Sequence, residues 1–216
     1  TDVRDRIEIE ESITLEEGFY FLGYDQWGCT FLGFIQVVKG GSTAPEEKPS
    51  DWAVDSVKRA NDLNLVPSGL NSNYAQPISR AEYCALATVL YEKLKGEITE
   101  RRTFADTTDV NVQKMGALKV VNGVGNDMFS PDSKLNREQS AVVLANLANA
   151  LGKPLEKKPA TFADKDAISS WALEAVGQVQ GASIMGGVGN NTFNPAGHYT
   201  REQSIITMLR LYDLMQ

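Results

Sequence analysis

The chain of 216 residues is 42% hydrophobic and 23% charged, an ordinary composition for a globular protein with one sizeable core or two smaller ones. Its net charge of −7 and pI near 4.9 argue against the broad basic surface that nucleic acid or an anionic membrane requires. We therefore expect no nucleic-acid partner, and any anion site must be a local arrangement of arginines.

Membrane and disulfide signals are absent from the sequence. No run of 18 apolar residues occurs, so we expect no membrane insertion. The chain begins at Thr1 without a methionine or a signal-peptide pattern, which indicates a processed or truncated fragment. Cys29 and Cys84 are too few for a disulfide framework, and we expect both to be free thiols.

Residues 1–38 have the pattern of short β-strands. Isoleucines alternate with glutamates over 7–9, and two apolar runs follow at 19–22 and 31–38. Because three short strands scarcely bury both of their faces alone, we expect this β-rich segment to pack against the rest of the chain, to self-associate with a second copy, or to pack against a missing domain. Residues 39–49 are rich in glycine, proline and serine and are predicted to be a linker.

From residue 50 onward the chain repeats itself. Three five-residue strings mark the repeat, with their arginines 57 and 64 residues apart: I-S-R-A-E at 78–82, L-N-R-E-Q at 135–139 and Y-T-R-E-Q at 199–203. Each string places Ser, Asn or Thr three residues ahead of Glu or Gln, the capping-box pattern of a helix N-terminus. We therefore expect repeats at 50–96, 103–152 and 161–216, each a helix, a turn-rich loop and a second helix.

The first helices and the loops differ among the repeats. Helices are predicted to begin near Trp52 in repeat one and Trp171 in repeat three, whereas repeat two has a shorter counterpart without tryptophan around 110–121. The loops that begin at Asn122 and Gly186 are rich in glycine and asparagine, the residues that accept positive φ values. The loop of repeat one is about two residues shorter.

The second helices carry matching apolar stripes. The positions +4, +7, +11 and +14 from each arginine are Cys84, Ala87, Tyr91, Leu94; Ala141, Leu144, Ala148, Leu151; and Ile205, Met208, Tyr212, Met215. Three such stripes bury one another in a bundle, with Gly96 and Gly152 as C-terminal caps. The predicted fold class is mainly α: three tandem helix-loop-helix repeats around a pseudo-threefold three-helix bundle, with a small β-rich N-terminal segment.

An arginine follows directly after each helix cap: Arg80, Arg137 and Arg201. The positive end of the helix dipole disfavours a cation there by roughly 0.3 to 1 kcal/mol. A guanidinium recognises a carboxylate bidentately and the free amides of a helix N-terminus favour an anion, so a bound carboxylate would offset this penalty. Alternatively, each arginine pairs with a carboxylate of the neighbouring repeat, such as Asp106, Asp132 or Asp164, and locks the repeats together.

These motifs resemble the S-layer homology family: a Trp-Ala pair near the first helix, a Phe-x-Asp opening at Phe104 and Phe162, a Gly-Asn loop ending in Phe-x-Pro, and a string like T-R-A-E. The resemblance covers about residues 48–216 in three tandem repeats. It implies a three-pronged fold whose grooves between repeats bind secondary cell-wall polysaccharide, often through a terminal pyruvylated amino sugar. It also implies an extracellular location at the cell surface, in the wall or S-layer of a Gram-positive-type bacterium.

The resemblance implies a ligand site of nine residues, and from the residues themselves we expect no cofactor or metal. Arginines would hold the ligand carboxylate, tryptophans would face the sugar, glycines would let backbone approach, and aspartates would accept sugar hydroxyls: Arg80, Arg137, Arg201, Trp52, Trp171, Gly125, Gly189, Asp106 and Asp164. Both tryptophans have an alternative role as core anchors. Repeat two lacks the tryptophan, repeats two and three carry Gln139 and Gln203 where the string usually has glutamate, and repeat one lacks the Phe-x-Asp opening. We therefore expect at most two competent grooves.

No catalytic constellation stands out. His198 is the only histidine, the two cysteines are distant, and the glycine-rich loops lack the lysine of a phosphate-binding loop and the acids of a calcium loop. We expect a non-enzymatic module that anchors an exported protein to the Gram-positive wall. The alternative is a structural or protein-interaction scaffold on the cell surface with degenerate grooves, which presents the β segment. A third hypothesis places catalysis in whatever precedes Thr1.

Overall fold

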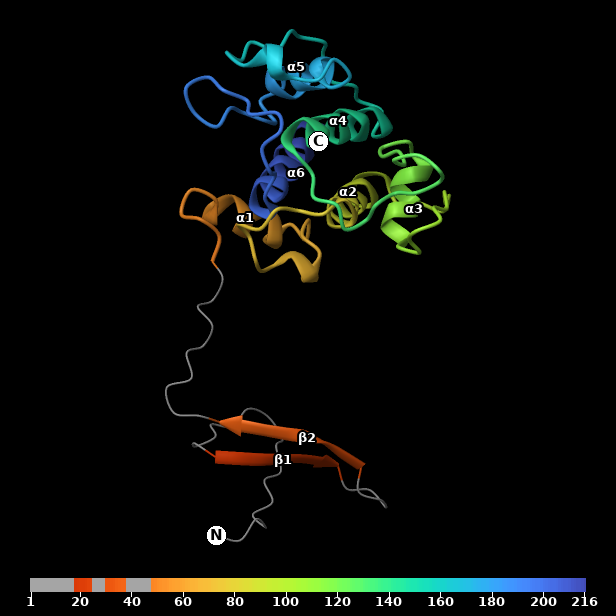
Figure 1. Cartoon of the computed structure of the whole chain (residues 1–216), viewed down its shortest axis with the longest axis vertical. Helices are drawn as coiled ribbons and strands as arrows, with labels where there is room; N and C mark the ends of the chain where they lie inside the picture. The colour runs from red at the N-terminus through yellow and green to blue at the C-terminus, as the bar shows by residue number, and fades with distance from the viewer. Residues whose placement is uncertain (1–17, 25–29, 38–47) are drawn as a thin grey trace. The chain divides into compact units, whose positions relative to one another are not determined.

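The computed structural model describes Gly18–Tyr24, Thr30–Val37 and residues 48–216. Residue contacts divide the chain into two units, 1–46 and 47–216, and each is described by itself (Figure 1).

The first unit contains a two-stranded antiparallel sheet. Strands β1 (Gly18–Tyr24) and β2 (Thr30–Val37) pair with a register irregularity between Leu22 and Gly23. The two predicted apolar strands are confirmed. The strand predicted at 7–9 and most of the predicted linker lie outside the described residues.

The second unit is helical, and each repeat supplies two helices. These are α1 (Val54–Asp62) and α2 (Arg80–Lys95), α3 (Val110–Ala117) and α4 (Arg137–Ala150), and α5 (Leu173–Gly181) and α6 (Arg201–Met215). Two 3₁₀ turns lie at Ser68–Leu70 and Lys165–Ala167. The predicted fold class, mainly α with helix-loop-helix repeats, is confirmed.

Each second helix begins at the predicted capping box. In α2 the Ser79 hydroxyl accepts a bond from the Glu82 amide (3.2 Å), while the Glu82 carboxylate accepts one from the Ser79 amide (2.8 Å). The pairs Asn136 with Gln139 and Thr200 with Gln203 repeat this arrangement in α4 and α6. Glutamine therefore completes the box as glutamate does.

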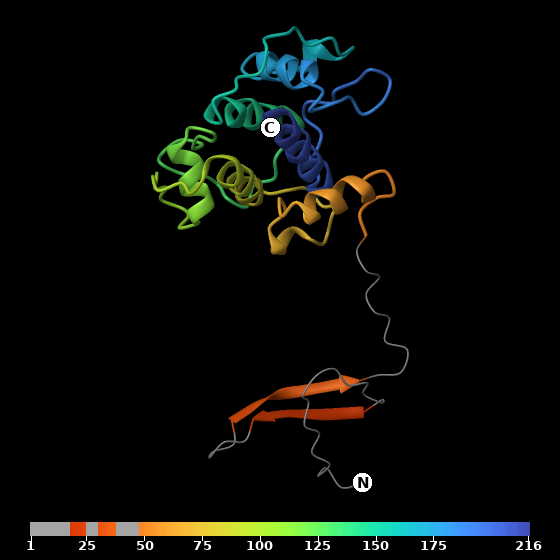
Figure 2. The same ribbon diagram turned by 180° about the vertical axis from the view of Figure 1, so that it is seen from behind.

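Helices α2, α4 and α6 form the central bundle, seen from opposite sides in Figures 1 and 2. Nine of the twelve predicted stripe positions are buried, and the other three, Tyr91, Leu94 and Met215, pack against the core. Gly96 caps α2 with φ 92°, and Gly152, with φ 80°, follows Leu151, the C-cap residue of α4. The bundle is thus closed by the contacts that the spacing predicted.

A cycle of three backbone hydrogen bonds joins the starts of the central helices. The amide of Ile78 donates to the Tyr199 carbonyl (2.8 Å), that of Tyr199 to Leu135 (3.1 Å), and that of Leu135 to Ile78 (3.1 Å). All three residues are buried. Because a buried amide left unpaired costs about 1 to 3 kcal/mol, this cycle fixes the helix starts around the pseudo-threefold axis.

The first helix of each repeat packs on the second helix of the preceding repeat. Helix α3 contacts α2, α5 contacts α4, and α1 contacts α6, which closes the cycle (Figure 2). The repeats are therefore joined at three equivalent junctions.

Candidate functional site

We name the junctions by the repeats they join. The 1/2 junction comprises the start of α2, helix α3 and loop 122–133; the 2/3 junction comprises α4, α5 and loop 186–197; the 3/1 junction comprises α6, α1 and loop 68–76.

The first two amides of each central helix donate to the loop of the next repeat. In the 1/2 junction the amides of Arg80 and Ala81 donate to the carbonyls of Ser133 and Pro131, both at 3.0 Å. The same pairs recur at the other two junctions, and the capping side chain takes the third amide. The expectation that free helix amides would bind a ligand anion is therefore wrong, because the neighbouring repeat already occupies them.

Arg137 reaches into the loop of the 2/3 junction. Its Nε donates to the Phe193 carbonyl (2.7 Å) and its Nη2 to the Gly186 carbonyl (2.6 Å), while the guanidinium carbon lies 4.8 Å from the centroid of the Phe193 ring. The residue is 5% exposed. Its Nη1 makes no hydrogen bond to a described residue and is not fully enclosed by protein, so it keeps contact with solvent.

The charge of Arg137 has no paired acid. Within the part of the chain that the structure describes, no carboxylate forms an ion pair with it. Burial lowers the pKa of Arg137, and the charges of Tyr199 and Asp164 oppose this shift only in part. The 2/3 junction therefore contains a cation that an incoming anion would stabilise.

Arg80 repeats this geometry at the 1/2 junction. Its Nε and Nη2 donate to the carbonyls of Phe129 and Asn122, both at 2.8 Å, and its guanidinium lies 4.3 Å from the Phe129 ring centroid. Burial lowers its pKa as well. Both arginines thus lock neighbouring repeats together, as the alternative proposed, but their partners are backbone carbonyls rather than Asp106, Asp132 or Asp164.

Arg201 differs from the other two arginines. Its Nη2 forms an ion pair with Glu82 (2.5 Å) and its Nη1 donates to the Ser72 carbonyl (3.0 Å), while its Nε is buried without a partner. Burial raises the pKa of Glu82, but the bonds from Arg201 and Ser79 outweigh it and leave that pKa below its usual value. The arginine of the 3/1 junction is therefore already paired with a carboxylate of this chain, that of Glu82.

Asp106 and Asp164 hold the loops that receive the arginines. Asp164 accepts bonds from the amides of Phe193 and Asn194, both at 2.7 Å, and Asp106 accepts the equivalent pair from Phe129 (2.7 Å) and its neighbour (2.6 Å). Burial opposes ionisation, but these amides keep the pKa of each carboxyl below its usual value. Each aspartate thereby fixes the phenylalanine whose carbonyl binds the arginine.

The sequence analysis did not single out two buried glutamates, Glu138 and Glu202. Glu138, 7% exposed, accepts bonds from the Ser169 amide (2.9 Å) and hydroxyl (3.0 Å), and Glu202, 4% exposed, accepts the same pair from Ser50 (2.9 and 2.8 Å). Glu138 follows Arg137 in α4 and binds the turn before α5. Glu202 follows Arg201 in α6 and binds the turn before α1. The shared signal is an Arg-Glu pair together with a serine two residues before a tryptophan.

The 1/2 junction lacks this tie. Ala81 stands where the other repeats have glutamate, and Asp109 caps α3 instead, accepting bonds from the amides of Asn111 (2.7 Å) and Val112 (3.0 Å). The missing tryptophan and the missing glutamate therefore occur at the same junction.

Trp52 and Trp171 lie on the surface. They are 61% and 57% exposed, while the next residues, Ala53 and Ala172, are fully buried. The alternative that these tryptophans anchor the core is wrong, because the alanines fill that position. Each indole stands two residues after the serine that a buried glutamate holds, so its backbone is fixed relative to the arginine-bearing helix at the 2/3 and 3/1 junctions.

Gly125 and Gly189 occupy the tips of the long loops. Their φ values are 108° and 121°, and no atom lies within 4 Å of where a side chain would begin. The adjoining Val124 and Val188 are 59% and 52% exposed. These glycines therefore allow the turn, and a role in ligand approach stays a prediction.

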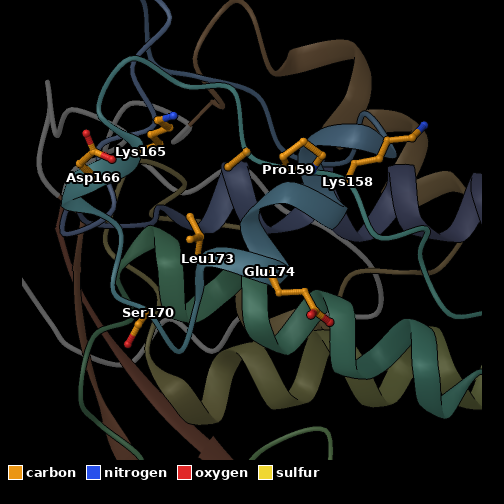
Figure 3. Close-up of a pocket in the computed structure, with 8 residues that line it drawn as sticks. Lys158, Pro159, Lys165, Asp166, Ser170, Leu173 and Glu174 are labelled. Carbon is orange, nitrogen blue, oxygen red and sulfur yellow. The ribbon is translucent and has the colours of Figure 1, made fainter.

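An open pocket of about 470 Å³ lies in repeat three (Figure 3). It borders the turn that carries Trp171, and its lining residues are Lys158, Pro159, Ala160, Lys165, Asp166, Ser170, Leu173 and Glu174. It contains none of the nine predicted site residues, and its lining combines two lysines with two acidic residues, so the charges of the lining balance.

The described residues contain neither a membrane-spanning helix nor a cluster of metal-binding side chains. Among the helices of residues 48–216, none is long and apolar enough to span a membrane. Within the same described range, no group of three or more histidine, cysteine, aspartate or glutamate side chains could hold a metal ion. Cys84 is a buried free thiol, as predicted, and Cys29 lies outside the described residues.

The cyclic junctions define a module of three tandem repeats. The family model of the S-layer homology domain matches residues 111–141 and 161–203, so these two stretches of the chain are similar to that family. The matched ranges include Arg137 and Arg201; repeat one lies outside them and shares their capping box and junction contacts. S-layer homology domains generally anchor proteins to the cell wall at the cell surface, as wall-binding rather than catalytic modules.

Two relatives share part of this sequence. An endoglucanase of Bacillus sp. (strain KSM-635) is 28% identical over 114 residues, which is 48% of this chain and 12% of the relative. An amylopullulanase of Thermoanaerobacterium thermosulfurigenes is 24% identical over 162 residues, 71% of this chain and 9% of the relative. The chain thus spans only about a tenth of the length of these relatives.

Proposed function

We propose that this chain anchors an exported protein to a Gram-positive-type cell wall by binding secondary wall polysaccharide at the 2/3 junction. The recognised group is a carboxylate-bearing sugar, such as a pyruvyl ketal. Arg137 binds the carboxylate and Trp171 packs on the sugar ring.

The buried charge of Arg137 is the observation that carries this proposal. Two carbonyls and the Phe193 ring hold the guanidinium in one orientation, so little conformational entropy remains to be lost on binding. Its Nη1 keeps contact with solvent, and no acid is paired with it among the described residues. A ligand carboxylate would supply the missing counter-charge.

Trp171 supplies an exposed apolar ring at the same junction. Its indole is 57% exposed, and Glu138 ties the preceding turn to the helix that begins with Arg137. An aromatic ring offers a large contact area at low conformational cost. The junction thus combines a fixed cation with an exposed ring, which suits an anionic sugar.

Neither of the other junctions combines an arginine that has no paired acid with an exposed tryptophan. The 1/2 junction has Arg80 in the same orientation but neither a tryptophan nor a glutamate tie. The 3/1 junction has Trp52, but Glu82 already pairs with Arg201. We therefore assign one competent junction of the three.

Retention on purified sacculi tests the proposal. Trp171→Ala removes an exposed ring without touching the core, so it should weaken retention by about tenfold, or about 1.4 kcal/mol, and leave stability unchanged. The surface control is Leu214→Ala, because Leu214 is a partly exposed residue near the C-terminus of α6. Mild acid, which hydrolyses ketal-linked pyruvate, should lower retention of the wild-type chain by a similar factor. Equal retention of Trp171→Ala and wild type would refute the site assignment.

A surface scaffold is the second candidate function. Val110, Val124 and Met128 of repeat two are 50%, 59% and 39% exposed, and a protein partner would bury this apolar surface. Retention that is insensitive both to acid treatment of the sacculi and to Trp171→Ala would favour the scaffold.

A further inference from the structure

The sequence contains one Asn-Gly pair, Asn122-Gly123, and it lies at the start of the long loop of repeat two. In such a pair the backbone amide of the glycine attacks the side-chain amide of the asparagine, because glycine has no Cβ to obstruct the approach. Asn122 is exposed, and the Gly123 amide donates no hydrogen bond within the described part of the chain. The attacking nitrogen is therefore not occupied by another acceptor.

Packing fixes the glycine of this pair but not the asparagine. A Cβ at Gly123 would lie 2.6 Å from the carbonyl oxygen of Met128, so a larger residue does not fit there. Repeat three has the same requirement at Gly187, where a Cβ would lie 2.8 Å from a backbone carbonyl oxygen. It has Gly186 in place of Asn122, however. The same loop therefore forms without the reactive side chain.

Arg80 activates the attacking amide. Its Nη2 donates to the Asn122 carbonyl at 2.8 Å, and that carbonyl belongs to the same peptide bond as the Gly123 nitrogen. When this nitrogen loses its proton, negative charge spreads onto the carbonyl oxygen, where the guanidinium stabilises it. Among the described residues no acid forms an ion pair with Arg80, so its charge is not already neutralised.

Arg102 lies beside the side-chain amide that is attacked. Its Nη1 donates to Oδ1 of Asn122 at 3.4 Å, and its guanidinium carbon lies 5.0 Å from the centroid of the Phe104 ring. Attack on Cγ places negative charge on Oδ1, so this cation stabilises the tetrahedral intermediate. The two arginines thus assist the two ends of one reaction.

We propose that Asn122 is a site of spontaneous modification, at which the fold promotes conversion of the asparagine to isoaspartate or aspartate. The Gly123 nitrogen loses its proton to solvent and forms a bond to Cγ of Asn122. The Cγ–Nδ2 bond then breaks, and Nδ2 takes up a proton from solvent and leaves as ammonia. Water hydrolyses the resulting succinimide ring. Overall, the side-chain amide and water give a carboxylic acid and ammonia, with no oxidant or reductant.

Both products add a carboxylate next to an arginine of the 1/2 junction. Hydrolysis at the backbone carbonyl gives isoaspartate, whose free α-carboxylate replaces the carbonyl that Arg80 contacts. Hydrolysis at Cγ gives aspartate, whose side-chain carboxylate lies beside Arg102. The modification therefore changes the charge of this junction.

Incubation of the folded chain at mildly alkaline pH, followed by peptide mass spectrometry, tests this inference. A mass increase of about 1 Da should appear in the peptide that contains Asn122 before any change at Asn190 or Asn191 of the equivalent loop. Asn122→Gly, which introduces the residue of repeat three, should abolish the increase in that peptide.

Two arginine variants test the role of the fold. Arg102→Gln should slow the reaction about threefold or more, the size expected of an interaction with an exposed charge. Arg101→Gln is the matched control, because it removes the same charge from the neighbouring residue, which bonds to the carbonyls of Ile98 and Glu100 instead. It should leave the rate unchanged. Circular dichroism checks that both variants remain folded.

The same chain unfolded in urea gives the reference rate. Activation by Arg80 and Arg102 predicts that Asn122 reacts at least as fast in the folded chain as in the unfolded one. A folded rate below the unfolded rate would overturn the proposal, and so would equal rates for Arg102→Gln and Arg101→Gln.

Discussion

Replacing Glu138 with alanine is predicted to lower the free energy of unfolding by about 2 to 4 kcal/mol. The carboxylate accepts two bonds from Ser169, at 2.9 and 3.0 Å, and hydrogen bonds to charged groups contribute about 1.5 to 3 kcal/mol each. The sum is reduced because Ser169 is only partly buried, so water replaces part of the loss, and because removing a buried carboxylate relieves its desolvation.

Urea unfolding followed by circular dichroism measures this loss. Glu202→Ala should lose a similar amount, since Glu202 makes the same two bonds to Ser50. Glu174→Ala is the control, because its ion pair with Lys157 is exposed and contributes at most about 1 kcal/mol. Losses below about 0.5 kcal/mol for both buried glutamates would refute the view that they tie the first helices to the bundle.

Two further predictions concern acid stability and packing. The pKa values of Asp106 and Asp164 are lower in the folded chain than the usual 3.8. Their contribution to stability is therefore complete above pH 3.8 and is lost as the pH falls below it. An acid titration in which stability rises as the pH falls below about 4 would contradict this. Gly177→Ala would place Cβ 1.9 Å from the Lys158 carbonyl and should cost about 1 to 3 kcal/mol in thermal unfolding, despite a better helix propensity. Gly69→Ala, with no atom within 4 Å, should change stability by less than about 0.5 kcal/mol, and equal effects of the two would count against the packing of α5.

Local patterns predicted the elements that depend on near neighbours in sequence. The capping boxes join residues three apart, and the bundle stripes repeat at heptad spacing, so both could be read from the chain alone. The exposure of Trp52 could not be read from the sequence, because the amphipathic pattern around it leaves open whether the indole or Ala53 enters the core.

The partners of the arginines could not be predicted, because they are distant and carry no side-chain signature. Arg137 bonds to carbonyls 49 and 56 residues away, and any residue type could supply them. Glu82 visibly stands where the other two strings have glutamine, but its partner Arg201 lies 119 residues further on. Cyclic closure of the repeats, which brings these residues together, is a property of the whole bundle.

Arginine side-chain NMR tests the central claim most directly. In a titration of the wild-type chain with wall polysaccharide released from sacculi, the guanidinium resonances of Arg137 should shift saturably, while those of Arg201 stay in place because Glu82 holds it. Saturable binding that leaves the Arg137 resonances unmoved would contradict the claim that its unpaired charge recognises the glycan.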